Sequence, residues 1–343
     1  MNVTVFQTED ELIYCYSGIN GSCTKRFHSS ALQSALCILF SVGTILTITG
    51  NIMVIISICL FKQLHSPTNF LILSLAIADF LLGATVLPFS AVRAIDTCWY
   101  FGEAFCTFHT SLDGGICVTS IFHVCLIAVD RYFAIIYPLI YPIRFTVCTT
   151  VFLLIFAWTV SMGYVFFLFY SGVANEGLEE LIMAISCKGN CQILTNAKWG
   201  LINSLIFFIP FSLMTCMYGR IFMVAKKQAK LIESLADQTG AAGKNSNRVR
   251  KRERKAATTL GIAMLAFVAC LLPYFIISVI DGFHNIIIPP FVYDIIIGIY
   301  YFNSALNPLI YAIFYPWFRK SIKLIVACKI FTSDFITINV FKQ

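Results

Sequence analysis

Charged residues are scarce in this sequence. Only 12% of its 343 residues are Asp, Glu, Lys or Arg, while 59% are hydrophobic, and an ordinary soluble domain carries about 25% charged residues. The mean hydropathy is +0.83. This balance excludes a water-soluble globular enzyme, because most of the protein's surface must face a medium other than water. The medium that fits is lipid.

Signatures of several other protein classes are also missing. The five histidines are scattered without metal-ligand spacing, and no phosphate-binding loop or nucleophile motif occurs, so the chain is not expected to be an enzyme. The fourteen cysteines are too few for a disulfide-dense secreted scaffold. Residues 1–30 contain no apolar core of a signal peptide, so we expect an exposed tail and a first crossing that acts as an uncleaved signal.

Seven apolar stretches are long enough to cross a bilayer. About 20 apolar residues span the roughly 30 Å of hydrocarbon. Such stretches lie at about 33–60, 68–92, 105–129, 147–170, 199–222, 257–280 and 291–313. They predict an all-α membrane protein with a seven-helix bundle over residues 33–313. Because the number of crossings is odd, the two termini lie on opposite sides of the membrane.

The positions of Lys and Arg predict which terminus lies outside the membrane and which lies inside. With the tail (residues 1–32) outside, 19 of the 24 Lys and Arg residues lie inside and only five lie in outer segments: Lys25, Arg26, Arg93, Lys188 and Lys198. The positive-inside rule therefore places the N-terminus outside and the C-terminus inside. Eleven of the 19 lie between Arg220 and Lys255, around a predicted third inner loop at about 223–256. This cluster either orients the helices and contacts lipid headgroups or forms a docking face for a cytosolic partner.

The predicted outer face carries groups that suit an oxidising and glycosylating compartment. Acceptor sequons begin at Asn2 and Asn20, which predicts glycans on both. Disulfides are permitted on this side of the membrane. Six cysteines lie on it or at its edge: Cys15, Cys23, Cys98, Cys106, Cys187 and Cys191.

Asp113 interrupts the third crossing. An ionisable group in a spanning helix is costly and is by default a candidate functional site; the alternative is a carboxylate satisfied by polar neighbours. Arg131 follows 18 residues later, or about 27 Å along a helix, so it reaches the inner surface when Asp113 lies in the outer part of the bundle. The neighbouring membrane segments hold no Lys or Arg, which indicates a ligand that supplies the positive charge.

Aromatic residues would form the walls of such a site. Tyr274 and Phe275 follow Pro273 in the sixth crossing, and residues 300–302 are Tyr, Tyr and Phe in the seventh. Aromatic rings suit both an ammonium and the apolar body of a ligand, although packing also explains any single ring.

A second carboxylate, Asp79, falls in the middle of the second crossing. Three polar residues of other crossings could surround it as oxygen ligands: Ser120, Asn303 and Asn307. Their polarity predicts an internal site for a sodium ion.

The motifs as a set resemble those of the rhodopsin-like G-protein-coupled receptors. They fall on matching crossings: Gly50-Asn51, Leu75-Ala76-Ile77-Ala78-Asp79, Asp130-Arg131-Tyr132, Trp158, Pro210 with Tyr218, Pro273, and Asn307-Pro308-Leu309-Ile310-Tyr311. Within that superfamily, four further segments are similar to those of the trace amine-associated receptors: 61–70, 98–102, 252–257 and 314–320. The likeness runs from about Cys15 to Phe331.

The resemblance implies a multi-pass receptor of the plasma membrane for small protonated amines, such as trace or volatile amines, serving in olfaction. It implies signalling mainly through a heterotrimeric G protein of the stimulatory or olfactory type, which raises cyclic AMP. Arrestin and a receptor kinase are implied partners, and no nucleic acid. Asp113 would pair with the ligand ammonium and Tyr301 would hold that carboxylate. The implied ligand set is Asp113, Cys117, Asn203, Leu271, Tyr274, Phe275 and Tyr301.

The resemblance also implies how binding is transmitted inward. Ile121, Pro210 and Phe267 match a connector between the pocket and the inner half of the bundle. The matching inner switch comprises Asp130, Arg131, Tyr132, Tyr218, Asn307, Pro308 and Tyr311. Phe314 to Lys323 resembles a short amphipathic eighth helix within residues 314–343, followed by Cys328 as a candidate for palmitoylation.

Disulfide pairing follows from the same resemblance. It implies one bond between Cys106 and Cys191, and a second, from tail to outer loop, between Cys23 and Cys187. The pairing of Cys15 stays open.

Three positions depart from the family's pattern. Leu271 and Gly298 stand where the family usually has Trp, and both losses are expected to enlarge the ligand pocket. Asn203 stands where some members carry a second acid that clasps a diamine, which predicts a monoamine ligand.

Two alternatives stay open on the sequence alone. One is a receptor-like protein whose altered pocket gives a weak or different ligand response. The other is a membrane transporter, although such proteins more often show discontinuous helices in two repeated halves, and no internal repeat occurs here. A retinal-based light sensor is excluded, since residues 291–313 contain no lysine to form a Schiff base.

Overall fold

The described part of the chain is almost entirely helical. The computed structural model describes residues 13–191, 193–239, 262, 265–280 and 290–327. Six of its helical segments are long and apolar enough to cross a membrane: Ser30–Leu60, Pro67–Asp96, Glu103–Ile136, Val147–Tyr170, Ala197–Val224 and Phe291–Phe314. A shorter apolar helix, Leu265–Ile280, overlaps the predicted sixth crossing, whose earlier residues lie largely outside the described ranges. The prediction of an all-helical membrane protein is therefore confirmed.

Local sequence signals explain where several helices begin. The side chains of Ser29, Ser66 and Thr146 each accept a hydrogen bond from a backbone N–H in the first turn of the helix that follows. Such N-caps satisfy donors that the helix itself leaves unpaired. The three helices are α1 (Ser30–Leu60), α2 (Pro67–Leu81) and α6 (Val147–Tyr170).

The second crossing is interrupted near its middle. A π-helical turn, η2 (Leu82–Val86), separates α2 from α3 (Leu87–Asp96), and the N–H of Leu87 bonds to the carbonyl of Leu82, five residues back. Pro88 follows directly and has no N–H to continue the regular ladder. Such π-bulges occur often at functional sites. Here α3 carries the fully buried Ser90 toward the centre of the bundle.

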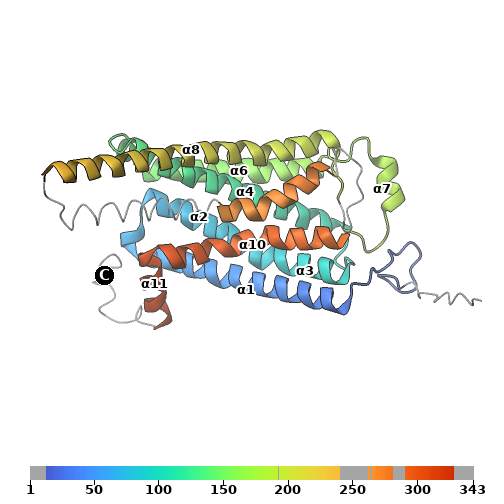
Figure 1. Cartoon of the computed structure of the whole chain (residues 1–343). Coiled ribbons are helices and arrows are strands. Elements are labelled where there is room, and N and C mark those ends of the chain that lie inside the picture. Colours follow the sequence, from blue (N-terminus) through green and yellow to red (C-terminus); the bar gives the residue numbers. More distant parts are fainter. Residues whose placement is uncertain (1–12, 192, 240–261, 263–264, 281–289, 328–343) are drawn as a thin grey trace, which may run out of the picture.

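The helices lie side by side along a common axis (Figure 1). The central helix, α4 (Glu103–Ile136), packs against α2, α6 and α8 (Ala197–Thr239), while α1 packs against α2 and α10 (Pro290–Phe314). At Gly50 the approach of α1 to α10 is especially close, because an added Cβ would lie 2.8 Å from Cβ of Pro308. Small residues allow this kind of contact between membrane helices.

The N-terminal tail is bound to the outer loops at one end of the bundle. Disulfides join Cys23 to Cys187 and Cys15 to Cys98, so the cysteine whose pairing the sequence left open is bonded to the first outer loop. An ion pair of 2.6 Å joins Lys25 Nζ to Asp96 Oδ1, and this hydrogen bond raises the pKa of Lys25. The tail and the short helix α7 (Glu179–Ile185) lie at the same end in Figure 1.

The opposite end of the bundle carries two helical extensions. The helix α11 (Pro316–Val326) turns across the end of α10, as Figure 1 shows, and buries Trp317 and Phe318 while Lys323 is exposed. The helix α8 continues to Thr239, so the first part of the predicted inner loop is helical rather than a loop. Good helix formers such as Ala, Lys, Gln and Leu dominate that stretch. Asn2, Cys328 and residues 240–261 lie outside the described residues.

Candidate functional site

Asp113 lies half-buried in the outer half of α4, with its two oxygens in different surroundings. Tyr301 donates its hydroxyl proton to Oδ2 over 2.5 Å. The other oxygen, Oδ1, receives only the thiol of Cys117 at 3.5 Å, and thiols are weak donors. Within the described ranges, no ion pair neutralises this carboxylate. One oxygen is therefore held by the protein while the other lacks a strong donor.

The expectation that nearby membrane segments contain no cation needs one correction. Arg93, predicted to lie in an outer loop, belongs to the last turn of α3 and to the second crossing. The residue is half-buried near the end of the helix, where a long side chain can keep its charge close to water. It makes no ion pair with a carboxylate of the described residues.

Tyrosines from two helices meet beside Asp113. The rings of Tyr274 and Tyr300 lie 4.9 Å apart, and those of Tyr300 and Tyr301 lie 5.7 Å apart. Phe275, predicted as a ligand contact, instead stacks on Phe207 of α8 with ring centroids 4.0 Å apart and is 8% exposed. The tyrosines thus lie near the carboxylate, whereas Phe275 packs between two helices.

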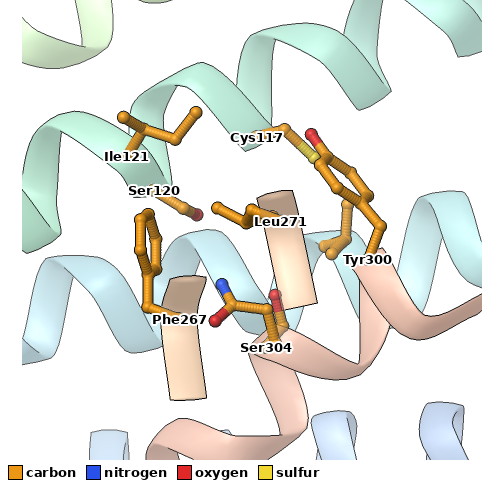
Figure 2. Close-up of a pocket in the computed structure, with 9 residues that line it drawn as sticks. Cys117, Ser120, Ile121, Phe267, Leu271, Tyr300 and Ser304 are labelled. Carbon is orange, nitrogen blue, oxygen red and sulfur yellow. The ribbon is translucent and has the colours of Figure 1, made fainter. Parts of the chain in front are cut away.

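A small cavity lies below these tyrosines. Nine residues line it: Leu82, Cys117, Ser120, Ile121, Phe267, Leu271, Tyr300, Asn303 and Ser304. Figure 2 shows the side chains of Leu271 and Phe267 facing Ser120 and Ser304 across it. Its volume is about 10 Å³, which is room for about one water molecule. The replacement of Trp by Leu271 therefore leaves little empty space, because neighbouring side chains fill most of the volume that a Trp side chain would occupy.

Gly298 does not enlarge the ligand pocket, so that expectation is wrong. A Cβ added at this residue would lie 2.5 Å from Cδ2 of Leu39 in α1. The space that a larger side chain could take is already filled by Leu39. The small residue instead permits close packing of α10 on α1.

Asp79 is fully buried at the centre of the bundle. Asn307 donates to its Oδ2 over 2.8 Å, while its Oδ1 has no hydrogen-bond partner among the described residues. Ser120 and Asn303 line the cavity described above, together with Ser304. A buried carboxylate oxygen without a partner is costly, and oxygen ligands of this kind suit a hard cation. The residues present therefore fit a sodium ion.

Asn203 of α8 is bonded to a neighbouring helix. Tyr164 of α6 donates its hydroxyl proton to the Asn203 amide oxygen over 2.6 Å. This bond uses one of the two lone pairs of the amide oxygen, and the amide carries no negative charge. Such a side chain is a poor partner for a second ammonium.

At the inner end, Arg131 is held in a network around the fully buried Asp130. The guanidinium forms an ion pair of 2.8 Å with Asp130 and also donates to Thr68. Thr68 and Tyr141 donate to the two oxygens of Asp130 over 2.8 and 2.7 Å. Burial raises the pKa of Tyr141, so this phenol keeps the proton that it donates.

The other predicted switch and connector residues occupy separate parts of the bundle. Ile121 and Phe267 pack in one buried cluster, with Tyr218 against it and Pro210 buried nearby in α8. Tyr311 packs in a different cluster with Phe318. Tyr132 contacts Phe133 and Tyr137 near the end of α4. No hydrogen bond among the described residues joins Arg131 to Tyr218 or Tyr311, so the structure does not bring the whole switch together.

A disulfide fastens the outer end of α4. Cys106 is bonded to Cys191, and both pack against Trp99 in a buried cluster. The bond holds the second outer loop above Asp113, which lies seven residues further along α4.

Sequence reasoning missed several residues next to the predicted ones. Ser90 lies beside Tyr301 and His109 lies beside Ser90, while Thr68 and Tyr141 bind Asp130. The available signal was weak: each is a polar residue near an end or a kink of an apolar run, and periodicity does not say which polar neighbours meet across helices.

Comparison with known proteins agrees with these observations. Residues 50–311 match the family described as "7 transmembrane receptor (rhodopsin family)". The chain is 50% identical over 339 residues to trace amine-associated receptor 9 of Mus musculus, covering 98% of this chain and 97% of that protein. It is 50% identical over 330 residues to trace amine-associated receptor 7b of Rattus norvegicus, covering 96% and 92%. The human receptor 9 is 48% identical over 342 residues, covering 99% and 98%.

These matches extend over nearly the whole chain, and the helices carry the family's motifs at the expected crossings. The family consists of multi-pass receptors of the plasma membrane rather than enzymes. The chain belongs to the trace amine-associated receptors, within the rhodopsin family of G-protein-coupled receptors.

Proposed function

We propose that this receptor binds a small protonated monoamine from outside and activates mainly a stimulatory G protein, raising cyclic AMP in an olfactory setting. The single observation that carries the proposal is the state of Asp113: its Oδ2 is held by Tyr301, and its Oδ1 has only a thiol donor. A partly desolvated carboxylate of this kind pairs favourably with an ammonium that supplies the missing charge. The relatives' names, which specify trace amines, support the same ligand class.

Asn203 supports a monoamine over a diamine. A diamine needs a second anionic or accepting group for its second ammonium. The amide oxygen of Asn203 already accepts one hydrogen bond from Tyr164, and the amide has no negative charge with which to pair a second ammonium. Tyr274 and Tyr300 supply aromatic faces for the single ammonium and the apolar body of its ligand.

Signalling requires that the amine bind the active arrangement of the bundle more tightly than the resting one. In the structure Arg131 is held by Asp130 and Thr68, about 27 Å along α4 from Asp113. We propose that Ile121, Pro210 and Phe267 pass the change inward until Arg131 leaves this network and opens a G-protein site. A sodium ion held by Asp79, Ser120 and Asn303 would stabilise the resting arrangement by neutralising the buried carboxylate. Arrestin and a receptor kinase are proposed to act at the same inner end.

The proposal is tested by a cyclic AMP assay in cells that express the receptor with a stimulatory G protein. We expect responses to monoamines such as 2-phenylethylamine, isoamylamine or trimethylamine, and weaker ones to cadaverine and putrescine. Asp113→Ala should abolish the responses while surface expression stays unchanged, because removing one partner of a buried ion pair costs about 3–5 kcal/mol, or two to three decades of affinity. A response led by diamines, or one that survives Asp113→Ala, would contradict the proposal and favour a receptor-like protein with an altered pocket.

A further inference from the structure

A row of buried polar groups lies behind the contact between Tyr301 and Asp113. Ser90 of α3 and His109 of α4 are each only 1% exposed. Ser90 Oγ lies 3.2 Å from Tyr301 Oη and 3.4 Å from His109 Nε2. The same His109 nitrogen lies 3.2 Å from the carbonyl oxygen of Val86. The hydrogen bonds therefore continue from the backbone of the second crossing to the carboxylate in α4.

The chemistry of donors and acceptors sets the direction of these bonds. A carboxylate accepts, so the one hydroxyl proton of Tyr301 goes to Asp113. Ser90 must then donate its own proton to Tyr301 Oη. The carbonyl of Val86 can only accept, so His109 carries a proton on Nε2 and offers it to Val86 and to Ser90. From His109 through Ser90 and Tyr301, the donations thus run toward Asp113, while the bond to Val86 anchors the His109 ring.

Packing keeps the row in place. The His109 ring lies 5.3 Å from the ring of Trp99 and 6.1 Å from that of Phe89. Ser90 sits on the short helix that follows the π-helical turn η2, which sets the direction of that helix. Successive donation in one direction polarises each bond and strengthens the next. Tyr301 is therefore both oriented and made a better donor.

We propose that Ser90 is a positioning residue for amine recognition: by donating to Tyr301, it keeps the phenol on Oδ2 of Asp113 and leaves Oδ1 to the ligand. This rests on the proposed function, since it takes Asp113 as the partner of the amine. The row divides the carboxylate into an oxygen satisfied by the protein and an oxygen offered to an N–H of the ammonium. Ser90 and His109 reach the ligand only through Tyr301.

A double-mutant cycle tests this inference, using Ser90→Ala, Tyr301→Phe and the double variant. The concentration of 2-phenylethylamine, isoamylamine or trimethylamine that gives half the maximal cyclic AMP response is measured at matched surface expression. Ser90→Ala should raise it about three- to tenfold, as expected for loss of one hydrogen bond. Because Ser90 acts through Tyr301, the double variant should respond like Tyr301→Phe alone. A control variant, Thr49→Val, removes a hydroxyl that bonds to the carbonyl of Ile45 within α1 and should shift the value less than twofold.

The outcomes separate the two proposals. Multiplied losses in the double variant, or no loss in Ser90→Ala while Asp113→Ala abolishes the response, would overturn the positioning role and leave the proposed function standing. A wild-type receptor that answers none of the three amines, or an Asp113→Ala variant that answers normally, would overturn the proposed function and with it this inference. If Ser90→Ala does not reach the cell surface, Ser90→Cys, a weaker donor of similar shape, takes its place in the cycle with the same expectations.

Discussion

At the scale of single residues, Leu271 shows how neighbours limit the effect of a smaller side chain. The residue is 4% exposed, and the cavity beside it has a volume of only about 10 Å³. Phe267 and Tyr300 line the same cavity. A larger side chain at this position must therefore displace them.

We predict that Leu271→Trp destabilises the receptor. Forcing extra atoms into a packed interior costs about 1–3 kcal/mol, which should lower the unfolding temperature of the detergent-solubilised protein. The matched control is Leu309→Trp on α10, where the side chain is 39% exposed and has room toward lipid. An unchanged unfolding temperature for Leu271→Trp would show that the space beside Leu271 is larger than the structure indicates.

The carboxylates of the two candidate sites, Asp79 and Asp113, were predictable from the sequence, because a charge within an apolar run is rare and conspicuous. The polar residues around them were only partly predictable. Asn307 beside Asp79 was predicted from polarity and Tyr301 beside Asp113 from the family resemblance, whereas Ser90 and His109 were not predicted. Their roles depend on which faces of α3, α4 and α10 meet. For the same reason, the sequence did not predict that Gly298 lies on the face of α10 that contacts Leu39 and not on the face toward the pocket.

At the scale of elements, the tail is an ordered part of the outer surface. Besides its two disulfides, the N–H of Cys15 donates to the carbonyl of Cys23, and that of Cys23 donates to the carbonyl of Lys188, each over 2.9 Å. Tyr16 also donates to the carbonyl of Trp99 over 3.3 Å. The tail therefore contacts both the first and the second outer loop.

We predict that Cys15→Ser frees the first part of the tail while Cys23–Cys187 keeps the remainder attached. Amide hydrogen exchange at residues 14–22 should become at least about tenfold faster, since local opening then costs less free energy. Cys98→Ser should give the same result because it breaks the same bond. Cys37→Ser, which changes a free and exposed cysteine of α1, should leave exchange in the tail as it was. Unchanged protection in Cys15→Ser would mean that the hydrogen bonds alone hold this segment.

Most elements were predictable from the length of the apolar runs, since burial in lipid dominates their placement. The structure begins α1 at Ser30 and α6 at Val147, within a few residues of the predicted crossings. The π-helical turn η2 was not predictable, because Pro88 signals a kink without specifying its form. The continuation of α8 to Thr239 was missed because charged residues mark the end of an apolar run. They do not mark the end of the helix.

At the scale of the whole molecule, the network around Asp130 holds Arg131 in what we propose is the resting arrangement of the inner end. Thr68 both donates to Asp130 and accepts from Arg131, so it ties α2 to the end of α4. Its removal weakens the resting arrangement without touching the amine site.

We predict that Thr68→Ala raises cyclic AMP in the absence of amine. A loss of about 1 kcal/mol from the resting state multiplies the active fraction by about five. The measurement is basal cyclic AMP normalised to surface expression. Thr49→Ala provides the control, since that hydroxyl bonds only to the carbonyl of Ile45 in its own helix. Basal signalling at or below the wild-type level in Thr68→Ala would show that the network does not restrain Arg131.

The length of α8 has a consequence for the protein's encounters in the cytoplasm. Its 43 residues extend about 65 Å, roughly twice the thickness of the hydrocarbon layer, and Figure 1 shows it reaching beyond its neighbours at the inner end. The excess forms a rigid helical extension past the inner ends of the neighbouring helices. A large cytoplasmic protein that binds at this end must approach from a side that the extension of α8 leaves open. The length of α8 therefore restricts the direction of approach before any specific contact forms.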